Sequence, residues 1–210
     1  MSAMLISIIC PPAVGKTTLA QALAEEMPGR LVLEDYRGNP FLAESYTGQA
    51  EARLPGQMYF LVSRVAQLCR LSWPAEGCVV SDYGFCQDRI YARLRLSADD
   101  YAAYDQVASR VEALVHPPDV TIALDAGVQT LLARVARRGR DYERVFNRAF
   151  LENLRSAYEL AIRRDDPRVI WVDCDAVDLR EPTHRARLAR MCQELAGGCC
   201  VRTGKTGRSG

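Results

Sequence analysis

A short stretch near the N-terminus, CPPAVGKTT at positions 10–18, contains most of a phosphate-binding loop. The pattern G-x-x-x-x-G-K-[ST] places backbone N–H groups around phosphates, a lysine on the β- and γ-phosphates, and a hydroxyl on magnesium. Gly15, Lys16 and Thr17 match its second half, whereas Cys10 occupies the place of its first glycine. The residues expected to bind the nucleotide are Pro12, Ala13, Val14, Gly15, Lys16, Thr17 and Thr18.

The surroundings of this stretch favour a phosphate loop over an ordinary strand-to-helix turn. Residues 4–9 form an apolar run typical of a buried parallel strand, and residues 18–27 have helical spacing. A second G-K-T at 204–206 has no strand before it and no helix after it in the sequence pattern, and we attribute it to the composition of the tail. Pro11 and Pro12 fix φ without requiring a positive value, so we expect the loop to form with an altered first turn.

Alternating strands and helices predict an α/β fold with a parallel sheet covered on both faces. The expected strands are 4–9, 30–34, 77–81, 119–125 and 168–173, and the main helices after the first are 54–73, 97–116, 128–138, 145–164 and 181–195. Ligands of such sheets bind beyond the carboxyl ends of the strands. Glu34 and Asp82 follow the second and third strands, so two carboxylates and the phosphate loop are expected to share one edge.

Composition narrows the class of protein. The 210 residues suit one domain, expected to span residues 1–196, and residues 197–210, with five glycines, predict a disordered tail. A net charge of +1 gives no argument for a nucleic-acid or membrane partner. Without a membrane-length apolar run or a signal peptide, a cytoplasmic location is expected. The eight cysteines form no C-x-x-C pair, and we interpret them as free thiols.

Four further motifs occur in order after the loop: LEDYRGNPFL (33–42), GQMYFLVSRVAQL (56–68), SDYGFCQDRIYA (81–92) and RVARRGRDYERVF (134–146). With the loop, they resemble the P-loop deoxynucleoside kinases, in particular those acting on deoxyadenosine, deoxyguanosine or deoxycytidine. The resemblance runs to about residue 160. It implies a P-loop NTPase-type fold with a parallel five-stranded sheet and an arginine-rich lid at about 134–144.

The resemblance also implies roles for single residues. Glu34 matches the general base for the sugar 5′-hydroxyl, and Gln57 matches the glutamine that hydrogen-bonds the base. Arg64 and Asp88 match a pair that borders the base, and Glu143 matches a lid acid on the 3′-hydroxyl. Thr17 and Asp82 are the expected magnesium ligands. Of the lid, Arg134, Arg138 and Arg140 match arginines that close over the nucleotide, and Tyr46 and Phe85 are candidate walls of the nucleoside pocket.

The sequence departs from the family at two positions after Asp82. The family motif [ED]-R-S has an arginine and a serine there, whereas this chain has Tyr83 and Gly84. The missing arginine normally approaches the reacting 5′-oxygen, so its loss removes a charge where charge placement matters.

We therefore expect a kinase that transfers the γ-phosphate of ATP, with Mg²⁺, to the 5′-hydroxyl of a deoxynucleoside in nucleotide salvage, with deoxyadenosine, deoxyguanosine or deoxycytidine preferred to thymidine. Two alternatives stay open: a nucleoside monophosphate kinase of the thymidylate kinase type, and a nucleotide-binding relative that has lost catalysis. The resemblance further implies a homodimer formed through helices such as 54–73.

Overall fold

The strands of the computed structural model, which describes residues 2–202 and the side chains of residues 2–196, form one parallel sheet. They are β1 (Met4–Ile9), β2 (Arg30–Val32), β3 (Cys78–Ser81), β4 (Val120–Asp125) and β5 (Val169–Asp173), in the spatial order β2-β3-β1-β4-β5. The central β1 is paired on both sides, with Ile6 opposite Val80 of β3 and Val120 of β4. The predicted five-stranded parallel sheet is confirmed.

Both faces of β1 are buried, which explains why five of its six residues are apolar and its one polar residue, Ser7, is buried. Ile6 and Ile8 belong to one core cluster with residues of α1 (Lys16–Glu26), α6 (Val128–Arg138) and α8 (Pro182–Arg202). Leu5 and Ile9 face the opposite side and join two other clusters. Because side chains alternate across a strand, a strand covered on both faces is apolar at nearly every position.

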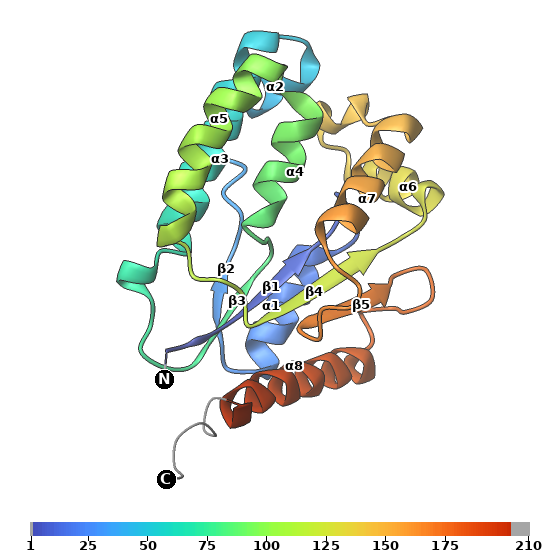
Figure 1. The fold of residues 1–210 in the computed structure, drawn as a ribbon. Coiled ribbons are helices and arrows are strands. Elements are labelled where there is room, and N and C mark those ends of the chain that lie inside the picture. The colour runs from blue at the N-terminus through green and yellow to red at the C-terminus, as the bar shows by residue number, and fades with distance from the viewer. Residues whose placement is uncertain (1, 203–210) are drawn as a thin grey trace.

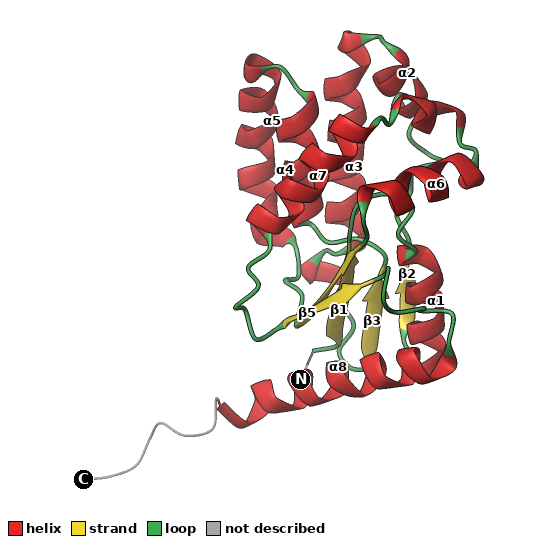
Figure 2. Ribbon diagram, turned by 90° about the vertical axis from the view of Figure 1, so that its right-hand side faces the viewer, coloured by secondary structure: helices red, strands yellow, loops and turns green. Residues whose placement is uncertain are grey.

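The remaining helices gather beyond the sheet (Figure 1; Figure 2). They are α2 (Leu42–Thr47), α3 (Arg53–Gln67), α4 (Cys86–Arg95), α5 (Ala98–Val111) and α7 (Arg148–Ala161). Figure 2 shows α2 to α5 above the strands, with α1 and α8 beside and below the sheet. Helices α3, α4 and α5 share a small core around Leu61 and Tyr104. This helical layer covers the carboxyl ends of the strands, where the sequence placed the ligand.

Local capping explains where several helices begin and end. The side chain of Ser97 accepts a hydrogen bond from the Asp100 backbone at 3.2 Å, as its N-cap position predicts. Gly139 ends α6 in the left-handed region with φ 66°, which confirms the predicted break. Asn147 caps α7 through the Phe150 N–H at 2.9 Å. For that reason α7 begins at Arg148, not at residue 145 as expected.

Other differences from the predicted helices concern their ends and one helix that was not predicted, and the helix expected over 97–116 ends at Val111. The helix expected over 54–73 ends at Gln67, because the chain extends at Cys69 to form a bridge with Val115. Helix α4 was not predicted, since two of its buried residues, Gln87 and Asp88, are polar and interrupt the apolar periodicity. The last helix, expected to end at 195, continues to Arg202. Most of the expected disordered tail, residues 203–210, and its G-K-T lie outside the described residues.

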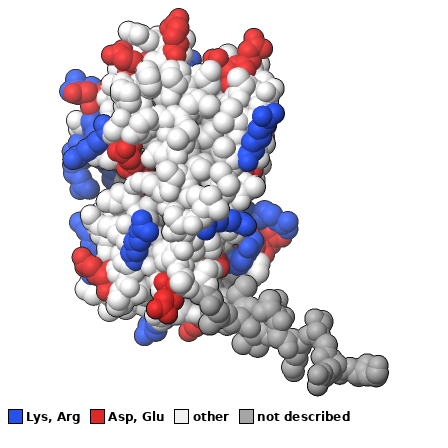
Figure 3. Space-filling view, turned by 90° about the vertical axis from the view of Figure 1, so that its left-hand side faces the viewer, with Lys and Arg blue, Asp and Glu red and all other residues white. Residues whose placement is uncertain are grey.

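Charges of both signs are scattered over the face shown in Figure 3, without a large patch of one sign. In the described part of the chain, no helix combines the length and the apolar character needed to cross a membrane.

Candidate active site

The loop between β1 and α1 forms as the sequence predicts. Gly15, at the N-cap of α1, has φ 123°, a value that requires glycine. Ala13 also has a positive φ, 64°, whereas Cys10 does not. The glycine replaced by Cys10 is therefore not needed for a left-handed backbone at this position. Cys10 is instead buried in the core, and the Nζ atom of Lys16 lies 3.4 Å from its carbonyl oxygen.

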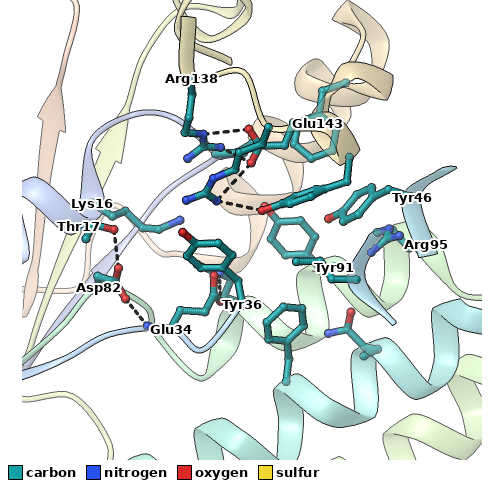
Figure 4. A pocket seen from close by; sticks show the side chains of 18 of the residues that line it. Lys16, Thr17, Glu34, Tyr36, Tyr46, Asp82, Tyr91, Arg95, Arg138 and Glu143 are labelled. Atoms are coloured by element: carbon teal, nitrogen blue, oxygen red, sulfur yellow. Dashed lines mark hydrogen bonds and ion pairs between the residues drawn. The ribbon is translucent and has the colours of Figure 1, made fainter. Parts of the chain in front are cut away.

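Two strand ends meet at this loop. The Thr17 hydroxyl donates to Asp82 Oδ2 at 2.6 Å, and the Glu34 backbone N–H donates to Asp82 Oδ1 at 2.7 Å. Asp82 follows β3 and Glu34 lies just beyond β2, so the predicted edge with two carboxylates and a phosphate loop is present. Figure 4 shows these side chains side by side with Lys16.

The donor atoms at this edge fit magnesium. A hydroxyl and a carboxylate are hard oxygen ligands, and Mg²⁺ commonly takes one or two from protein and the rest from phosphates and water. Among the described residues no group of three or more histidine, cysteine, aspartate or glutamate side chains forms an all-protein metal site. Thr17 and Asp82 are thus suited to a metal that arrives with a nucleotide.

A narrow cavity of about 100 Å³ lies between this edge and the helical layer (Figure 4). Predicted site residues that line it are Pro12, Lys16, Thr17, Glu34, Tyr46, Gln57, Arg64, Asp82, Arg138, Arg140 and Glu143. An adjoining cleft of about 650 Å³ is lined by Ala13, Val14, Gly15, Thr18 and Arg134, among others. Small-molecule pockets usually measure roughly 300–1,000 Å³, so this narrow cavity must widen to admit a nucleoside.

A buried ion-pair network crosses the floor of the cavity. Arg64 Nη2 contacts Glu34 Oε1, and its Nη1 lies 2.5 Å from Asp88 Oδ1. Gln57 Nε2 donates to the Asp88 carboxylate at 3.0 Å and to its backbone carbonyl at 3.1 Å. Asp88 itself does not line the cavity but fixes both neighbours from behind. Gln57 and Arg64, seven residues apart in α3, thus lie on one face of the helix and share Asp88 as a partner.

The charge state of Glu34 follows from its neighbours. Burial alone would raise the pKa of this carboxyl group, but the positive charges of Arg64 and Lys16 outweigh burial and lower the pKa below its ordinary value. Gln87 Nε2 adds a hydrogen bond to Glu34 Oε1 at 3.2 Å. Glu34 is therefore an ionised hydrogen-bond acceptor that faces the cavity.

Segment 134–144 closes one side of the cavity through its arginines. Arg138 pairs with both carboxylate oxygens of Glu143, which is 3% exposed, and Arg140 donates to Tyr142 Oη at 3.0 Å. The Arg140 guanidinium also lies over the ring of Tyr36, 4.0 Å from its centre. These contacts join the end of α6 to the residues that follow β2.

Arg134 has different surroundings. Its Nη1 donates to the Val14 carbonyl at 2.9 Å and its Nη2 to the Cys174 carbonyl at 3.2 Å. The side chain thus ties the phosphate loop to the segment after β5. Its predicted role in closing over the nucleotide stays a prediction. A cleft of about 650 Å³ beside it, between α6, the phosphate loop and residues 174–180, has room for a nucleotide base.

The two predicted aromatic walls lie in different places. Tyr46 lines the cavity, stacked against Tyr142 at 5.7 Å and with the Arg95 guanidinium 3.5 Å from its ring centre. Phe85 does not reach this cavity. It packs against buried clusters beneath α3 and α5 and lines a groove on another side, because it precedes the first turn of α4.

Sequence reasoning missed several residues of the cavity, which are Tyr36, Leu42, Phe60, Gln87, Tyr91, Arg95, Tyr142 and Phe146. Gln87 and Tyr91 belong to α4, whose existence was not predicted. Tyr36 stands two residues after Glu34 and Tyr142 one before Glu143. Tyr36 and Tyr142 could thus have been found from their closeness in sequence to the predicted carboxylates.

Comparisons with known proteins agree with this geometry. Residues 6–196 match the deoxynucleoside kinase family. The chain is 32% identical over 185 residues to deoxyguanosine kinase of Bacillus subtilis, covering 84% of this chain and 89% of that protein. It is 30% identical to the deoxyadenosine/deoxycytidine kinase of the same organism, over 74% of this chain and 75% of the relative.

The fold is similar to that of a solved deoxyadenosine kinase. The structure from M. mycoides, with the products dCMP and a flexible dCDP bound, has a TM-score of 0.77 and 21% identity over 91% of this chain and all of that one. The topology, the phosphate loop, the carboxylate edge and the sequence match all agree. We conclude that the chain belongs to the deoxynucleoside kinase family.

Proposed function

We propose that this deoxynucleoside kinase transfers the γ-phosphoryl group of ATP to the 5′-hydroxyl of a deoxynucleoside that carries an amino group on its base. The observation that supports this most directly is the single cavity in which Lys16 and Thr17 of the phosphate loop face Glu34 and Gln57. Phosphate-binding and nucleoside-binding groups in one cavity suit a direct transfer between two small molecules.

At the phosphate end, the proposed roles follow from charge. The N–H groups of the loop and the Lys16 ammonium group would hold the β- and γ-phosphates, and Thr17 with Asp82 would hold magnesium, which neutralises phosphate charge when bound. Arg138 and Arg140 would exchange their contacts with Glu143 and Tyr36 for the transferred phosphoryl group. The donor base would lie in the cleft beside Arg134.

At the nucleoside end, the ionised Glu34 would accept the proton of the 5′-hydroxyl. The 5′-oxygen then forms its bond to the γ-phosphorus as the bond from that phosphorus to the β,γ-bridging oxygen breaks, and the leaving group is ADP. Lys16 and the arginines stabilise the charge on the departing oxygen without giving up a proton. The product is a deoxynucleoside 5′-monophosphate, which returns a salvaged deoxynucleoside to the nucleotide pool.

The preference for an amino-bearing base rests on the orientation of Gln57. Both acceptors around its Nε2 atom belong to Asp88, so the amide nitrogen must face them and the amide oxygen is left for the cavity. An acceptor suits the amino groups of adenine, cytosine or guanine, whereas on thymine it meets two carbonyl oxygens that flank the one N3–H donor. Gln57→Met removes the acceptor, whereas Gln57→Glu would place a second carboxylate against Asp88.

The test is the identity and base dependence of the product. Purified protein with ATP and Mg²⁺ should form the 5′-monophosphate of deoxyadenosine, deoxyguanosine or deoxycytidine, identified by chromatography and ³¹P NMR. Gln57→Met should lower kcat/KM for the preferred nucleoside by about 10- to 100-fold, the range expected when a buried polar contact is lost. Phosphorylation of thymidine at the same rate as the others would contradict the base assignment.

We also propose that two copies of the chain associate as a dimer, as the family resemblance implies. A groove of about 670 Å³ lies between α4 and α7, and its lining includes the apolar residues Ile90, Leu94, Ala157 and Leu160. Leu160 is 87% exposed there, and large apolar patches of this kind commonly mark interfaces. The surface differs from the helix expected from the sequence, since α3 packs against α2, α4 and α5.

Light scattering after size exclusion tests the dimer and its surface. Leu160→Glu should convert the dimer to a monomer, whereas Val145→Glu, at an apolar position that is 45% exposed and does not line the groove, should remain dimeric. A monomeric wild-type protein at micromolar concentration would contradict the dimer. Val62 lies on the exposed side of α3. If Val62→Glu dissociates the dimer and Leu160→Glu does not, the interface is formed by α3.

A further inference from the structure

Tyr83, which stands where the family motif has an arginine, does not point at the phosphates. Its side chain is fully buried and belongs to the core cluster that includes Leu5 and Val32. One face of its ring lies 5.2 Å from the guanidinium of Arg64, and the ring of Phe60 lies 5.1 Å from the same guanidinium. The aromatic residue thus contacts the buried cation of the active site.

The Tyr83 ring is held in place at its far end. Its hydroxyl donates to Gln67 Oε1 at 2.5 Å, and Gln67 Nε2 donates to the carbonyl of Leu33 at 3.0 Å. Leu33 directly precedes Glu34 in the chain. The position of the ring is therefore tied to the same backbone that carries Glu34.

Arg64 completes the connection. Its guanidinium is 4% exposed and contacts the carboxylates of Glu34 and Asp88. A buried charge is costly unless it is paired and hydrogen-bonded. The placement of the Arg64 guanidinium therefore determines whether it keeps its contact with Glu34. Asp88 anchors one nitrogen and the two aromatic rings fix the plane, which leaves the other nitrogen on Glu34 Oε1.

We propose that Tyr83 is a positioning residue of the phosphoryl transfer: it holds Arg64 against Glu34, so that a cation remains at the reacting end of the nucleoside site although the motif arginine is absent. The inference rests on the proposed role of Glu34. Arg64 remains protonated throughout and takes no proton. By occupying Oε1, it leaves Oε2 of Glu34 for the 5′-hydroxyl.

Kinetics of three Tyr83 variants test the proposal. Tyr83→Phe keeps the ring and should retain kcat within about 3-fold of wild type. Tyr83→Leu removes the ring and should lower kcat by about 10- to 30-fold, the loss expected for a desolvated cation–π contact, while KM for ATP stays unchanged. Tyr83→Trp, which supplies a ring, should recover part of the kcat lost in the leucine variant.

A double-mutant cycle separates positioning from simple core packing. In an Arg64→Met background, Tyr83→Leu should have no further effect on kcat, since its action runs through Arg64. Tyr104→Leu is the matched control: Tyr104 is equally buried and its hydroxyl has no partner among the described residues. This variant should lose thermal stability with kcat within about 3-fold of wild type.

The outcomes are distinguishable from failure of the proposed function. Wild-type protein without any deoxynucleoside-dependent turnover would overturn that function and, with it, this inference. If the wild type is active, two results would overturn the inference alone. One is a Tyr83→Leu kcat within 3-fold of wild type. The other is an equal loss of kcat on Tyr83→Leu in the Arg64→Met background.

Discussion

Restoring a side chain at position 84 should destabilise the protein, although the family motif has a serine there. A Cβ built on Gly84 would lie 2.6 Å from Cγ2 of Ile9, closer than any real Cβ contact. Ile9 is 1% exposed at the end of β1, and its β-branched side chain is stiff. The backbone of Gly84 is not in the left-handed region, so the clash alone decides the effect.

The size of the effect follows from overpacking. Extra atoms in a well-packed core cost about 1–3 kcal/mol. For a domain of about 200 residues, each kcal/mol shifts the unfolding midpoint by about 2–4 °C. Gly84→Ala should therefore unfold roughly 2–12 °C below wild type. Gly84→Ser adds a hydroxyl to the same position and should cost at least as much.

Thermal and urea unfolding followed by circular dichroism measure this loss. Gly56→Ala is the control, because Gly56 lies in α3 and an added Cβ would make only an ordinary 3.5 Å contact with Phe41. That variant should be at least as stable as wild type, with a gain of up to about 0.5–1 kcal/mol in the free energy of unfolding. In an Ile9→Ala background, which lacks Cγ2, Gly84→Ala should lose most of its cost. A Gly84→Ala midpoint within 1 °C of wild type would refute the packing argument.

Three further predictions concern the catalytic edge. Lys16→Ala and Glu34→Gln should each lower kcat by roughly 100-fold or more; near-wild-type turnover of Glu34→Gln would remove this residue from the mechanism. Asp82→Asn replaces one acceptor of the Thr17 and Glu34 hydrogen bonds and removes the charge, so the Mg²⁺ concentration for half-maximal activity should rise about 10-fold or more. An unchanged Mg²⁺ requirement would exclude Asp82 as a ligand. Burial raises the pKa of Cys10 to about 11, so at pH 8 only about one molecule in a thousand carries the reactive thiolate. Iodoacetamide should leave Cys10 unmodified in the native protein and label it after unfolding, as mass spectrometry of the peptides would show; rapid labelling of the native protein would disagree with its burial.

Much of the fold could be predicted because the sheet is buried on both faces. Residues 4–9 were assigned to their strand without error, since every position of β1 faces a core. The break at Gly139 and the cap at Ser97 were also predicted, because each depends on the local chemistry of one residue. Helix α4 was not predicted because two of its buried residues, Gln87 and Asp88, are polar, and polar residues on a buried face do not contribute to hydrophobic periodicity.

The site was predictable where chemistry is carried by strand ends and less so where it depends on side-chain packing. The meeting of Thr17, Asp82 and Glu34 followed from parallel-strand topology alone. The resemblance predicts the Arg64–Asp88 pair, but no pattern in the sequence shows that Arg64 also contacts Glu34, or that Tyr83 supports it. Such contacts depend on three elements far apart in the chain, and only their packing brings them together.

The most direct test of the central assignment is ADP formation from ATP and Mg²⁺ by purified protein with each of the four deoxynucleosides, their monophosphates, and no acceptor. We predict turnover that depends on deoxyadenosine, deoxyguanosine or deoxycytidine and that exceeds the rates with thymidine and with every monophosphate by about 10-fold or more. Turnover only with a monophosphate would instead indicate a monophosphate kinase. ATP binding without any acceptor-dependent turnover would contradict the assignment of Glu34 and Lys16 to a working kinase site.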